Sequence, residues 1–169
     1  ENGFPVVIIR PFNSYGPRYT EPYIIPEILS QVLNGNKQLT LGNIEATRDF
    51  TYVSDTADAI IRSIDAKKAI GEIVNVGSGY ETSIRDLAFK IAKIAKKKIK
   101  IKYDEGRERP YDVNRLCCNN KKAKNLLGWK PKISINSGLR KTFNWATKNR
   151  IVFRTPFKRF YYKGLAPKR

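Results

Sequence analysis

Three polar side chains in this sequence are of the types that hold a diphosphate. They are the amide of Asn13 and the guanidinium groups of Arg48 and Arg109. A guanidinium can donate two hydrogen bonds to phosphate oxygens at once and an amide adds a further donor, so the three would suit a pyrophosphate if the fold brought them together. Their segments are residues 10–18 (RPFNSYGPR), 47–55 (TRDFTYVSD) and 107–112 (RERPYD).

Each of these residues also has a plainer interpretation. Asn13 lies in a Gly-Pro turn segment, where a solvent-facing amide is common. Arg48 and Arg109 would then form surface ion pairs with their neighbours Asp49 and Glu108, and such pairs contribute little stability in water. Sequence order alone does not decide between one shared site and separate surface contacts.

Composition excludes several other chemistries. The sequence has no histidine, so its own residues cannot form a Ser-His-Asp or Cys-His nucleophile system. The only cysteines, Cys117 and Cys118, are adjacent, which fits neither a disulfide framework nor a two-plus-two zinc site. We therefore expect no metal site and a reduced, cytoplasmic protein.

The apolar run 6–9 is the strand that must position Asn13. It consists of β-branched residues bounded by Pro5 and by Arg10-Pro11, a pattern typical of a strand buried on both faces of a parallel sheet. Ligands of open α/β sheets bind beyond the carboxyl ends of the strands, which is where segment 10–18 would lie.

Short strands and amphipathic helices alternate along the rest of the chain, which indicates an α/β architecture. One helix begins at Ser54 or Asp55, either of which could cap it, and runs to Ile64. The apolar residues that share one face of this helix are Ala57, Ile60, Ile61 and Ile64. The other expected strands are 37–41, 72–76 and 99–103, and the other expected helices lie between Pro22 and Gly35, after a capping box at Ser83 and Asp86, and over 123–127 and 135–146.

The formal net charge of +18 indicates an anionic partner, without choosing among nucleic acid, an acidic membrane surface and a phosphorylated metabolite. Many of the lysines between residues 93 and 102 fit the solvated face of a helix that runs into an edge strand. We therefore expect no specific nucleic acid and no membrane partner, and a basic nucleic-acid-binding module stays as the alternative of another class. The tail 151–169 is basic and aromatic without acidic residues. It could bind an anionic surface, but a poorly ordered end or the stub of a longer segment is the favoured interpretation.

Taken in order, these segments resemble the extended short-chain dehydrogenase/reductase family of nucleotide-sugar epimerases and 4,6-dehydratases. The resemblance covers roughly residues 1–148 and includes segments 75–79 (NVGSG) and 120–131 (NKKAKNLLGWKP). The combination of Arg109-Pro110 with Asp112, and the residues of segment 47–55, most resemble the corresponding motifs of bacterial UDP-N-acetylglucosamine 4,6-dehydratases. UDP-sugar 4-epimerases are the alternative.

The resemblance implies a fold and a role for each matching residue. The fold would contain the last parallel strands of a Rossmann-like NAD domain plus a small α/β substrate-binding domain, all within residues 1–150. Pro11 and Phe12 would border the NAD cofactor. The residues implied to bind the UDP-sugar substrate are Asn13, Arg48 and Arg109 at the pyrophosphate, Asp112 near the ribose, Tyr23, Ile24 and Ile25 beside the nucleotide, partly through backbone groups, and Leu39 and Leu41 in the wall of the base pocket.

The catalytic part of that family has no counterpart in this chain. The family binds NAD through an amino-terminal glycine-rich turn and uses a Tyr-x-x-x-Lys pair, in which the lysine lowers the pKa of the tyrosine. No tyrosine here has a lysine four positions later, and Gly77-Ser78-Gly79 lacks the third glycine of a dinucleotide fingerprint.

We therefore expect no catalytic residue in this chain and no turnover by it alone. The start at Glu1 suggests a chain that begins mid-protein. The resemblance implies that the full-length protein is an NAD-dependent dehydratase, a lyase that is commonly homodimeric and acts in cell-surface polysaccharide biosynthesis.

Overall fold

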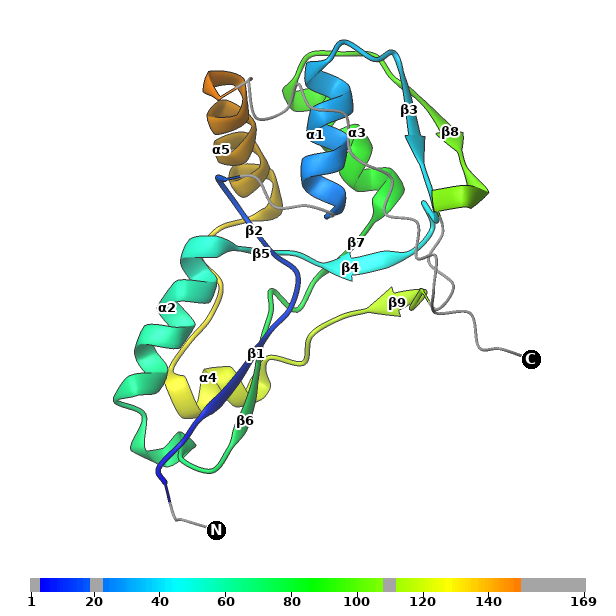
Figure 1. The fold of residues 1–169 in the computed structure, drawn as a ribbon. Coiled ribbons are helices and arrows are strands. Elements are labelled where there is room, and N and C mark those ends of the chain that lie inside the picture. Colours follow the sequence, from blue (N-terminus) through cyan, green and yellow to red (C-terminus); the bar gives the residue numbers. More distant parts are fainter. Residues whose placement is uncertain (1–3, 19–22, 108–111, 150–169) are drawn as a thin grey trace, which may run out of the picture.

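The computed structural model of the protein describes residues 4–18, 23–107 and 112–149. The elements form two lobes joined by a layer of short strands (Figure 1). The first, which we call the strand-pair lobe, contains β1 (Ile8–Pro11), β6 (Ile73–Val76), α2 (Val53–Ile64), the short helix η1 (Lys67–Ala69) and α4 (Lys121–Leu127). The second, the helical lobe, contains α1 (Ile24–Leu33), α3 (Ile84–Ile94), α5 (Ile135–Lys148), β3 (Gln38–Leu41) and β8 (Lys100–Tyr103).

The core of the strand-pair lobe forms on one face of two parallel strands. β1 and β6 are paired in register from Ile8 with Ile73 to Pro11 with Val76. Val74 and Val76 are fully buried and pack with Trp129, which follows the left-handed Gly128 that ends α4. The indole N–H of Trp129 donates to the backbone oxygen of Asp55 at 2.9 Å, so the polar edge of this buried ring has a partner.

The helical lobe holds the larger core, built from apolar stripes at helical spacing. The residues of α1 and α3 that it buries are Ile25, Ile28, Leu29, Val32, Leu33, Ile84, Leu87, Ala88 and Ile91. They pack with one another and with Leu39 and Leu41 of β3, all within one cluster. Fully burying one such leucine or isoleucine contributes about 1.5–3 kcal/mol, so this cluster dominates the stability of the lobe.

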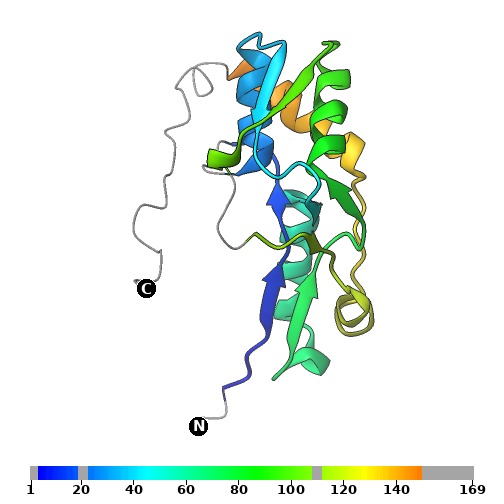
Figure 2. The same ribbon diagram turned by 90° about the vertical axis from the view of Figure 1, so that its right-hand side faces the viewer.

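The middle layer consists of short strands that join the lobes. β2 (Ser14–Tyr15) and β5 (Thr51–Tyr52) pair in parallel, while β4 (Thr47–Asp49) lies between the antiparallel β7 (Glu81–Ser83) and the parallel β9 (Arg115–Leu116). In Figure 2 the strand pair and the helical lobe lie at opposite ends of the molecule, with this layer between them. The layer therefore holds parts of two of the three segments on which the diphosphate site was predicted, 10–18 and 47–55.

The predicted α/β class is confirmed, because strands alternate with helices and four strand pairs among the described residues are parallel. The predicted cap of α3 is also confirmed, since the Ser83 hydroxyl accepts a hydrogen bond from the Asp86 backbone N–H at 3.0 Å. Within the described ranges, no helix combines the length and the apolar character needed to cross a membrane. The tail 151–169 lies outside the described residues.

β1 differs from the expected strand buried on both faces. Val6 and Ile8 are 54% and 51% exposed, and Ile73, the register partner of Ile8, is 43% exposed. The physical reason is that β6 is the only strand paired with β1 in the described part of the chain, and one face of the pair carries no covering element there. The prediction of a doubly buried strand is therefore wrong for these residues.

The beginning and the buried face of α2 also differ from expectation. The helix begins at Val53, and neither Ser54 nor Asp55 caps it, because Tyr52 occupies the cap position without a side-chain hydrogen bond. Its buried side is formed by Asp55, Thr56 and Ala59. The stripe of isoleucines that made the helix amphipathic is exposed instead: Ile60, Ile61 and Ile64.

Candidate nucleotide-binding site

Asn13 is fixed just beyond the carboxyl end of β1. The N–H of Phe12 donates to Val76 on β6 at 2.8 Å, which continues the strand pairing to the point where the chain leaves the sheet. The carbonyl of Asn13 accepts from the Thr51 N–H at 3.1 Å, and its side-chain amide donates to the backbone oxygen of Asp49 at 3.2 Å. Asn13 is thus held against Asp49 of β4, the residue that follows Arg48 in the sequence.

Asp49 holds the segments of this site together through a buried carboxylate. Its carboxylate is fully buried and accepts hydrogen bonds from the backbone N–H groups of Ser78, Gly79 and Cys118 at 2.8, 2.8 and 3.1 Å. The Ser78 hydroxyl adds a fourth at 2.6 Å. A carboxylate this deeply buried requires such donors because it has lost its hydration.

The turn at Gly77 closes tightly around the same carboxylate. A Cβ atom at Gly77 would lie 2.3 Å from the Cys118 Cβ and 3.0 Å from the Asp49 Oδ2, so glycine is needed there. In the Gly77-Ser78-Gly79 turn, the N–H groups of Ser78 and Gly79 bind Asp49. This turn is therefore an internal anchor, and its likeness to a dinucleotide-binding loop is superficial.

Arg48 points toward segment 112–118 and away from the carboxylate next to it in sequence. Its Nη2 lies 2.5 Å from Asp112 Oδ1, and its Nη1 donates to the backbone oxygen of Thr47 at 2.7 Å. Both side chains of the ion pair are mostly buried, with 14% of Arg48 and 23% of Asp112 exposed. The alternative pairing of Arg48 with Asp49 is wrong, because the Asp49 carboxylate faces the interior.

Two of the three predicted pyrophosphate ligands are therefore neighbours. Asn13 and Arg48 are joined through Asp49, and Asp112, predicted near the ribose, contacts Arg48 directly. Arg109 lies outside the described residues. The role of each residue toward a ligand stays a prediction.

The other predicted substrate contacts lie along the helical lobe. Tyr23 immediately precedes α1 and is 58% exposed, Ile24 is partly buried, and Ile25 is 2% exposed. Leu39 and Leu41 are fully buried, so their side chains contact the core. Of the predicted cofactor contacts, Pro11 is exposed and Phe12 half-buried, both at the carboxyl end of β1.

One segment links β3 and α1 to the Arg48 region. The Asp104 N–H donates to the Leu41 oxygen at 2.9 Å. Arg107, in the short helix η2 (Glu105–Arg107), forms ion pairs with Asp104 and with Glu27 of α1. Burial raises the pKa of the Glu27 carboxyl, although Arg107 and Gln31 oppose that shift. Both ends of residues 107–112 are therefore attached, one to α1 and one to Arg48.

Tyr15, two residues after Asn13, has a structural role. Burial raises the pKa of the Tyr15 hydroxyl, and the neighbouring Tyr52 and Asp55 raise it further. This hydroxyl donates to the Ile135 oxygen at 3.3 Å and keeps its proton at neutral pH. A general base needs the opposite shift, so the Tyr15 hydroxyl is not suited to accept a proton. In the described ranges, no three of His, Cys, Asp and Glu gather as metal ligands would.

Sequence reasoning missed the structural role of two aspartates that support the site. Asp49 was considered as an ion-pair partner and Asp55 as a helix cap, yet both are buried acceptors of backbone N–H groups. The Asp55 carboxylate binds the N–H groups of Lys132 and Ile133 at 2.9 and 2.8 Å. The only sign in the sequence that these carboxylates are buried was their position in the otherwise mainly apolar and aromatic stretch 49–55.

Comparison with known proteins finds relatives over most of the chain. Residues 1–142 match the family model described as GDP-mannose 4,6 dehydratase. A UDP-N-acetyl-alpha-D-glucosaminuronate decarboxylase from Bacillus cytotoxicus is 36% identical over 157 residues, which cover 85% of this chain and 46% of that protein.

Two solved structures superpose on most of the chain. An epimerase from Methanothermobacter thermautotrophicus has a TM-score of 0.81 at 30% identity, covering 89% of this chain and 45% of its own. A UDP-glucuronic acid 4-epimerase from Bacillus cereus, in complex with UDP-glucuronic acid and NAD, has a TM-score of 0.79 at 29% identity. This match covers 86% of this chain and 46% of the epimerase. The chain spans about half the length of the curated relatives it matches, between 42% and 48%.

Proposed function

We infer the function from one premise: the chain belongs to the extended short-chain dehydrogenase/reductase family of nucleotide-sugar dehydratases and epimerases. We propose that it binds the nucleoside diphosphate of a UDP-sugar, with Arg48 and Asn13 at the pyrophosphate. It thereby supplies the substrate-binding portion of an NAD-dependent enzyme and no catalytic residue.

The observation that carries this proposal is the junction of Asn13 and Arg48 at the open end of a parallel strand pair. Asn13 follows β1, Arg48 lies on β4, and the buried Asp49 fixes both. A guanidinium has five N–H donors, and the contacts of Arg48 with Thr47 and Asp112 use its two terminal nitrogens once each. Phosphate oxygens can share this guanidinium with Asp112, whose carboxylate holds it in position.

We propose a 4,6-dehydratase as the activity of the full-length protein. Such an enzyme oxidises the sugar at C4, removes water across C5 and C6, and returns the hydride to the sugar. NAD would supply the redox chemistry as hydride acceptor and donor. Among the described residues, Phe12 at the carboxyl end of β1 fits a position beside it, while the Gly77-Ser78-Gly79 turn does not fit its phosphates, because those N–H groups bind Asp49. A 4-epimerase is the alternative activity, and we propose a cytoplasmic homodimer in both cases.

Calorimetric titration with UDP and with UDP-N-acetylglucosamine tests the binding site. Arg48→Ala is expected to weaken binding by about 10- to 100-fold, the loss of charge-assisted hydrogen bonds worth 1.5–3 kcal/mol. Arg85→Ala is the matched control, because it removes the same charge from an exposed ion pair with Glu45 on the helical lobe. We expect it to change the affinity less than twofold.

The same variants separate this function from general binding of polyanions. If Arg48→Ala and Arg85→Ala weaken UDP binding equally, or if an oligonucleotide binds with steep salt dependence while UDP does not bind, the UDP-sugar site is wrong and a basic nucleic-acid-binding module is favoured. Turnover is a separate measurement. The purified 169 residues should neither reduce NAD nor dehydrate UDP-N-acetylglucosamine, and detectable product would contradict the proposed division of labour.

A further inference from the structure

The ion pair between Glu27 and Arg107 connects two stretches that carry predicted nucleotide contacts. Glu27 lies in the first turn of α1, and its backbone N–H donates to the Tyr23 oxygen at 3.1 Å. The two side chains of the pair are mostly buried, with 21% of Glu27 and 29% of Arg107 exposed. Further along the chain, Asp112 holds Arg48. The pair therefore joins the residues predicted beside the nucleotide to the segment that positions the predicted pyrophosphate ligand.

This ion pair closes a ring of contacts that runs through β3. Gln31, one turn further along α1, donates to the Thr40 oxygen at 3.0 Å and accepts from the Thr40 N–H at 2.8 Å. The next link is Asp104, whose N–H donates to the Leu41 oxygen at 2.9 Å and whose carboxylate lies 3.2 Å from the Arg107 guanidinium. Removal of the ion pair would therefore leave η2 attached to β3 and release it from α1.

Stability alone does not account for the charge on Glu27. Burial raises the pKa of this carboxyl, and Arg107 and Gln31 offset the shift only in part. Within the described ranges Arg107 is the one cation that forms an ion pair with it, and β3 carries no charged side chain. An acid whose pKa is raised by folding makes the folded state less stable once it is ionised. Partly buried ion pairs can instead fix one geometry.

We propose that Glu27 is a positioning residue of the nucleotide site, which acts through Arg107 to hold Asp112, and hence Arg48, where a diphosphate binds. The ligand in this inference rests on the proposed function, whereas the ring of contacts does not. Five residues of chain span at most about 18 Å, so the position of Arg107 limits where Asp112 can lie. Fixing both positions before a ligand binds lowers the entropy lost on binding.

Calorimetric titration with UDP-N-acetylglucosamine tests the positioning role. We expect Glu27→Gln to weaken binding by about 3- to 30-fold, the range for residues that are coupled to a site without touching the ligand. Arg107 keeps its ion pair with Asp104 in this variant, so no charge is left unpaired. Glu72→Gln is the matched control, because it makes the same change in an exposed ion pair with Lys122, and the affinity should change less than about twofold.

A double variant shows whether Glu27 acts through Arg107. Arg107→Gln should also weaken binding, and Glu27→Gln combined with Arg107→Gln should bind no worse than the weaker single variant, because both remove the same contact. Additive losses overturn the proposal. Deuterium uptake without ligand is a readout independent of affinity. Residues 112–118 should exchange faster in Glu27→Gln than in Glu72→Gln, and equal rates also overturn the proposal.

The pH dependence separates positioning from a merely structural role. Acid protonates Glu27 and removes its attraction to Arg107, while the pyrophosphate of the sugar nucleotide, esterified at both ends, keeps its charge. Between about pH 7 and pH 5 the affinity of the unsubstituted protein should therefore fall toward that of Glu27→Gln, which should stay level. The contribution of Glu27 to folding stability rises over the same change, because its pKa is raised in the folded state. An equal loss of affinity in Glu27→Gln contradicts the positioning role.

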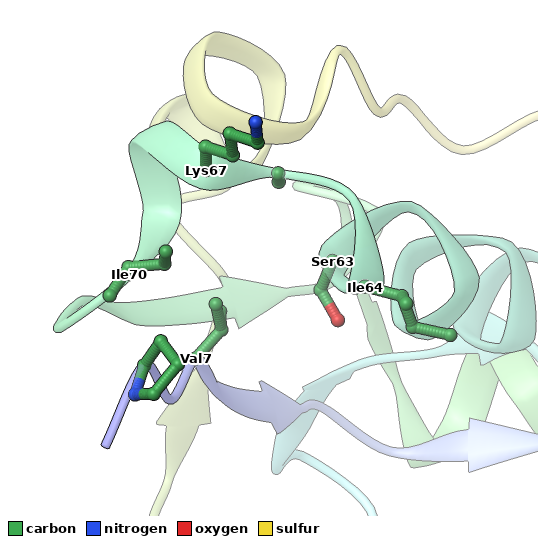
Figure 3. Close-up of a pocket in the computed structure, with 7 residues that line it drawn as sticks. Val7, Ser63, Ile64, Lys67 and Ile70 are labelled. Atoms are coloured by element: carbon green, nitrogen blue, oxygen red, sulfur yellow. The ribbon is translucent and has the colours of Figure 1, made fainter.

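A hollow in the strand-pair lobe is the alternative place for the nucleotide. It has a volume of about 370 Å³, and Figure 3 shows Val7, Ser63, Lys67 and Ile70 around it. Lys67→Ala removes the one cation among its lining residues and should leave the affinity unchanged within about twofold.

The combined results separate the two proposals. If Lys67→Ala weakens binding while Arg48→Ala and Glu27→Gln do not, the nucleotide occupies the hollow, and both the proposed site and the positioning role are wrong. The same holds if the unsubstituted protein binds no UDP-N-acetylglucosamine. Weaker binding by Arg48→Ala with unchanged binding by Glu27→Gln refutes the positioning role alone and leaves the proposed function intact.

Discussion

At the scale of single residues, Asp49 determines where the site lies. We expect Asp49→Asn to lower the free energy of unfolding by about 3 kcal/mol or more, because the new amide group replaces one acceptor oxygen with a donor facing backbone N–H groups. Urea unfolding at neutral pH measures this. Asp65→Asn, an exposed residue with the same change of charge, should differ from the unsubstituted protein by less than about 0.5 kcal/mol. Equal stability of the two variants would show that the Asp49 carboxylate is dispensable.

Cys118 gives the protein a sensitivity to alkali. Burial, with smaller effects of Asp49 and Cys117, raises the pKa of its thiol from an ordinary value of 9.0 to about 12. The folded state keeps a proton that the unfolded state releases, so stability is present below pH 9 and is lost as pH rises from 9 toward 12.

Cys118→Ala should therefore flatten the decline in unfolding free energy between pH 8.5 and 10.5, measured by urea unfolding. Cys117→Ala is the control, because that side chain is exposed and should leave the decline largely in place. An unchanged decline in Cys118→Ala would mean that other groups cause it.

The residues of the site could be predicted from the sequence better than the partners with which they form hydrogen bonds and ion pairs. The sequence identified Asn13 and Arg48 as candidates, because both lie at the ends of predicted elements, but it did not decide that they are neighbours, which the structure shows. The ion pair of Arg48 with Asp112 spans 64 positions, and the hydrogen bond of Cys118 with Asp49 spans 69. Contacts at such separations are set by tertiary packing, which one sequence does not reveal.

At the scale of elements, α5 packs against the middle layer through Gly138. A Cβ there would lie 2.1 Å from the Tyr15 hydroxyl oxygen and 2.9 Å from the Tyr52 ring, and Tyr15 also packs edge-on against Phe50. Gly138→Ala should therefore destabilise the protein by about 1–3 kcal/mol through overpacking, although alanine is the better helix former.

Ser137→Ala in the same turn is the control for this prediction. Its side chain is exposed, so the substitution should be nearly neutral in thermal unfolding. A Gly138→Ala variant that is more stable than the unsubstituted protein would mean that Tyr15 has room to move.

The contact of α2 with segment 129–133 is a second link between elements. The carboxylate of Asp55 receives two backbone N–H groups of that segment, and Asp58, one turn later on α2, forms exposed ion pairs with Arg62 and Lys132. We expect Asp55→Ala to cost about 3 kcal/mol of unfolding free energy and Asp58→Ala less than about 1 kcal/mol, measured by urea unfolding. Similar losses would indicate that charge, rather than the buried hydrogen bonds, is responsible.

Element type was predictable from periodicity, whereas the side of an element that is covered was not. The spacing of Ile60, Ile61 and Ile64 predicted a helix correctly, yet these residues face solvent. The apolar run at β1 likewise predicted a parallel strand, yet its face is open. Both patterns describe residues suited to burial, and whether they are buried depends on what lies beside them.

At the scale of the whole molecule, the two lobes have separate cores. The core around Leu87, Ile91 and Val32 belongs to the helical lobe, and the one around Val74, Val76 and Trp129 to the strand-pair lobe. The second core is smaller, and the sheet on which it is built has an uncovered face and an unpaired edge within the described residues.

Deuterium uptake should therefore follow a fixed sequence in time. Backbone amides of β6 are expected to exchange well before those in the middle of α3, because opening the smaller core need not disturb the larger one. Mass spectrometry of peptides from each lobe, after increasing times in heavy water, would detect two populations of protection. A single rate of uptake at both places would mean that the molecule opens as one cooperative unit, despite its divided interior.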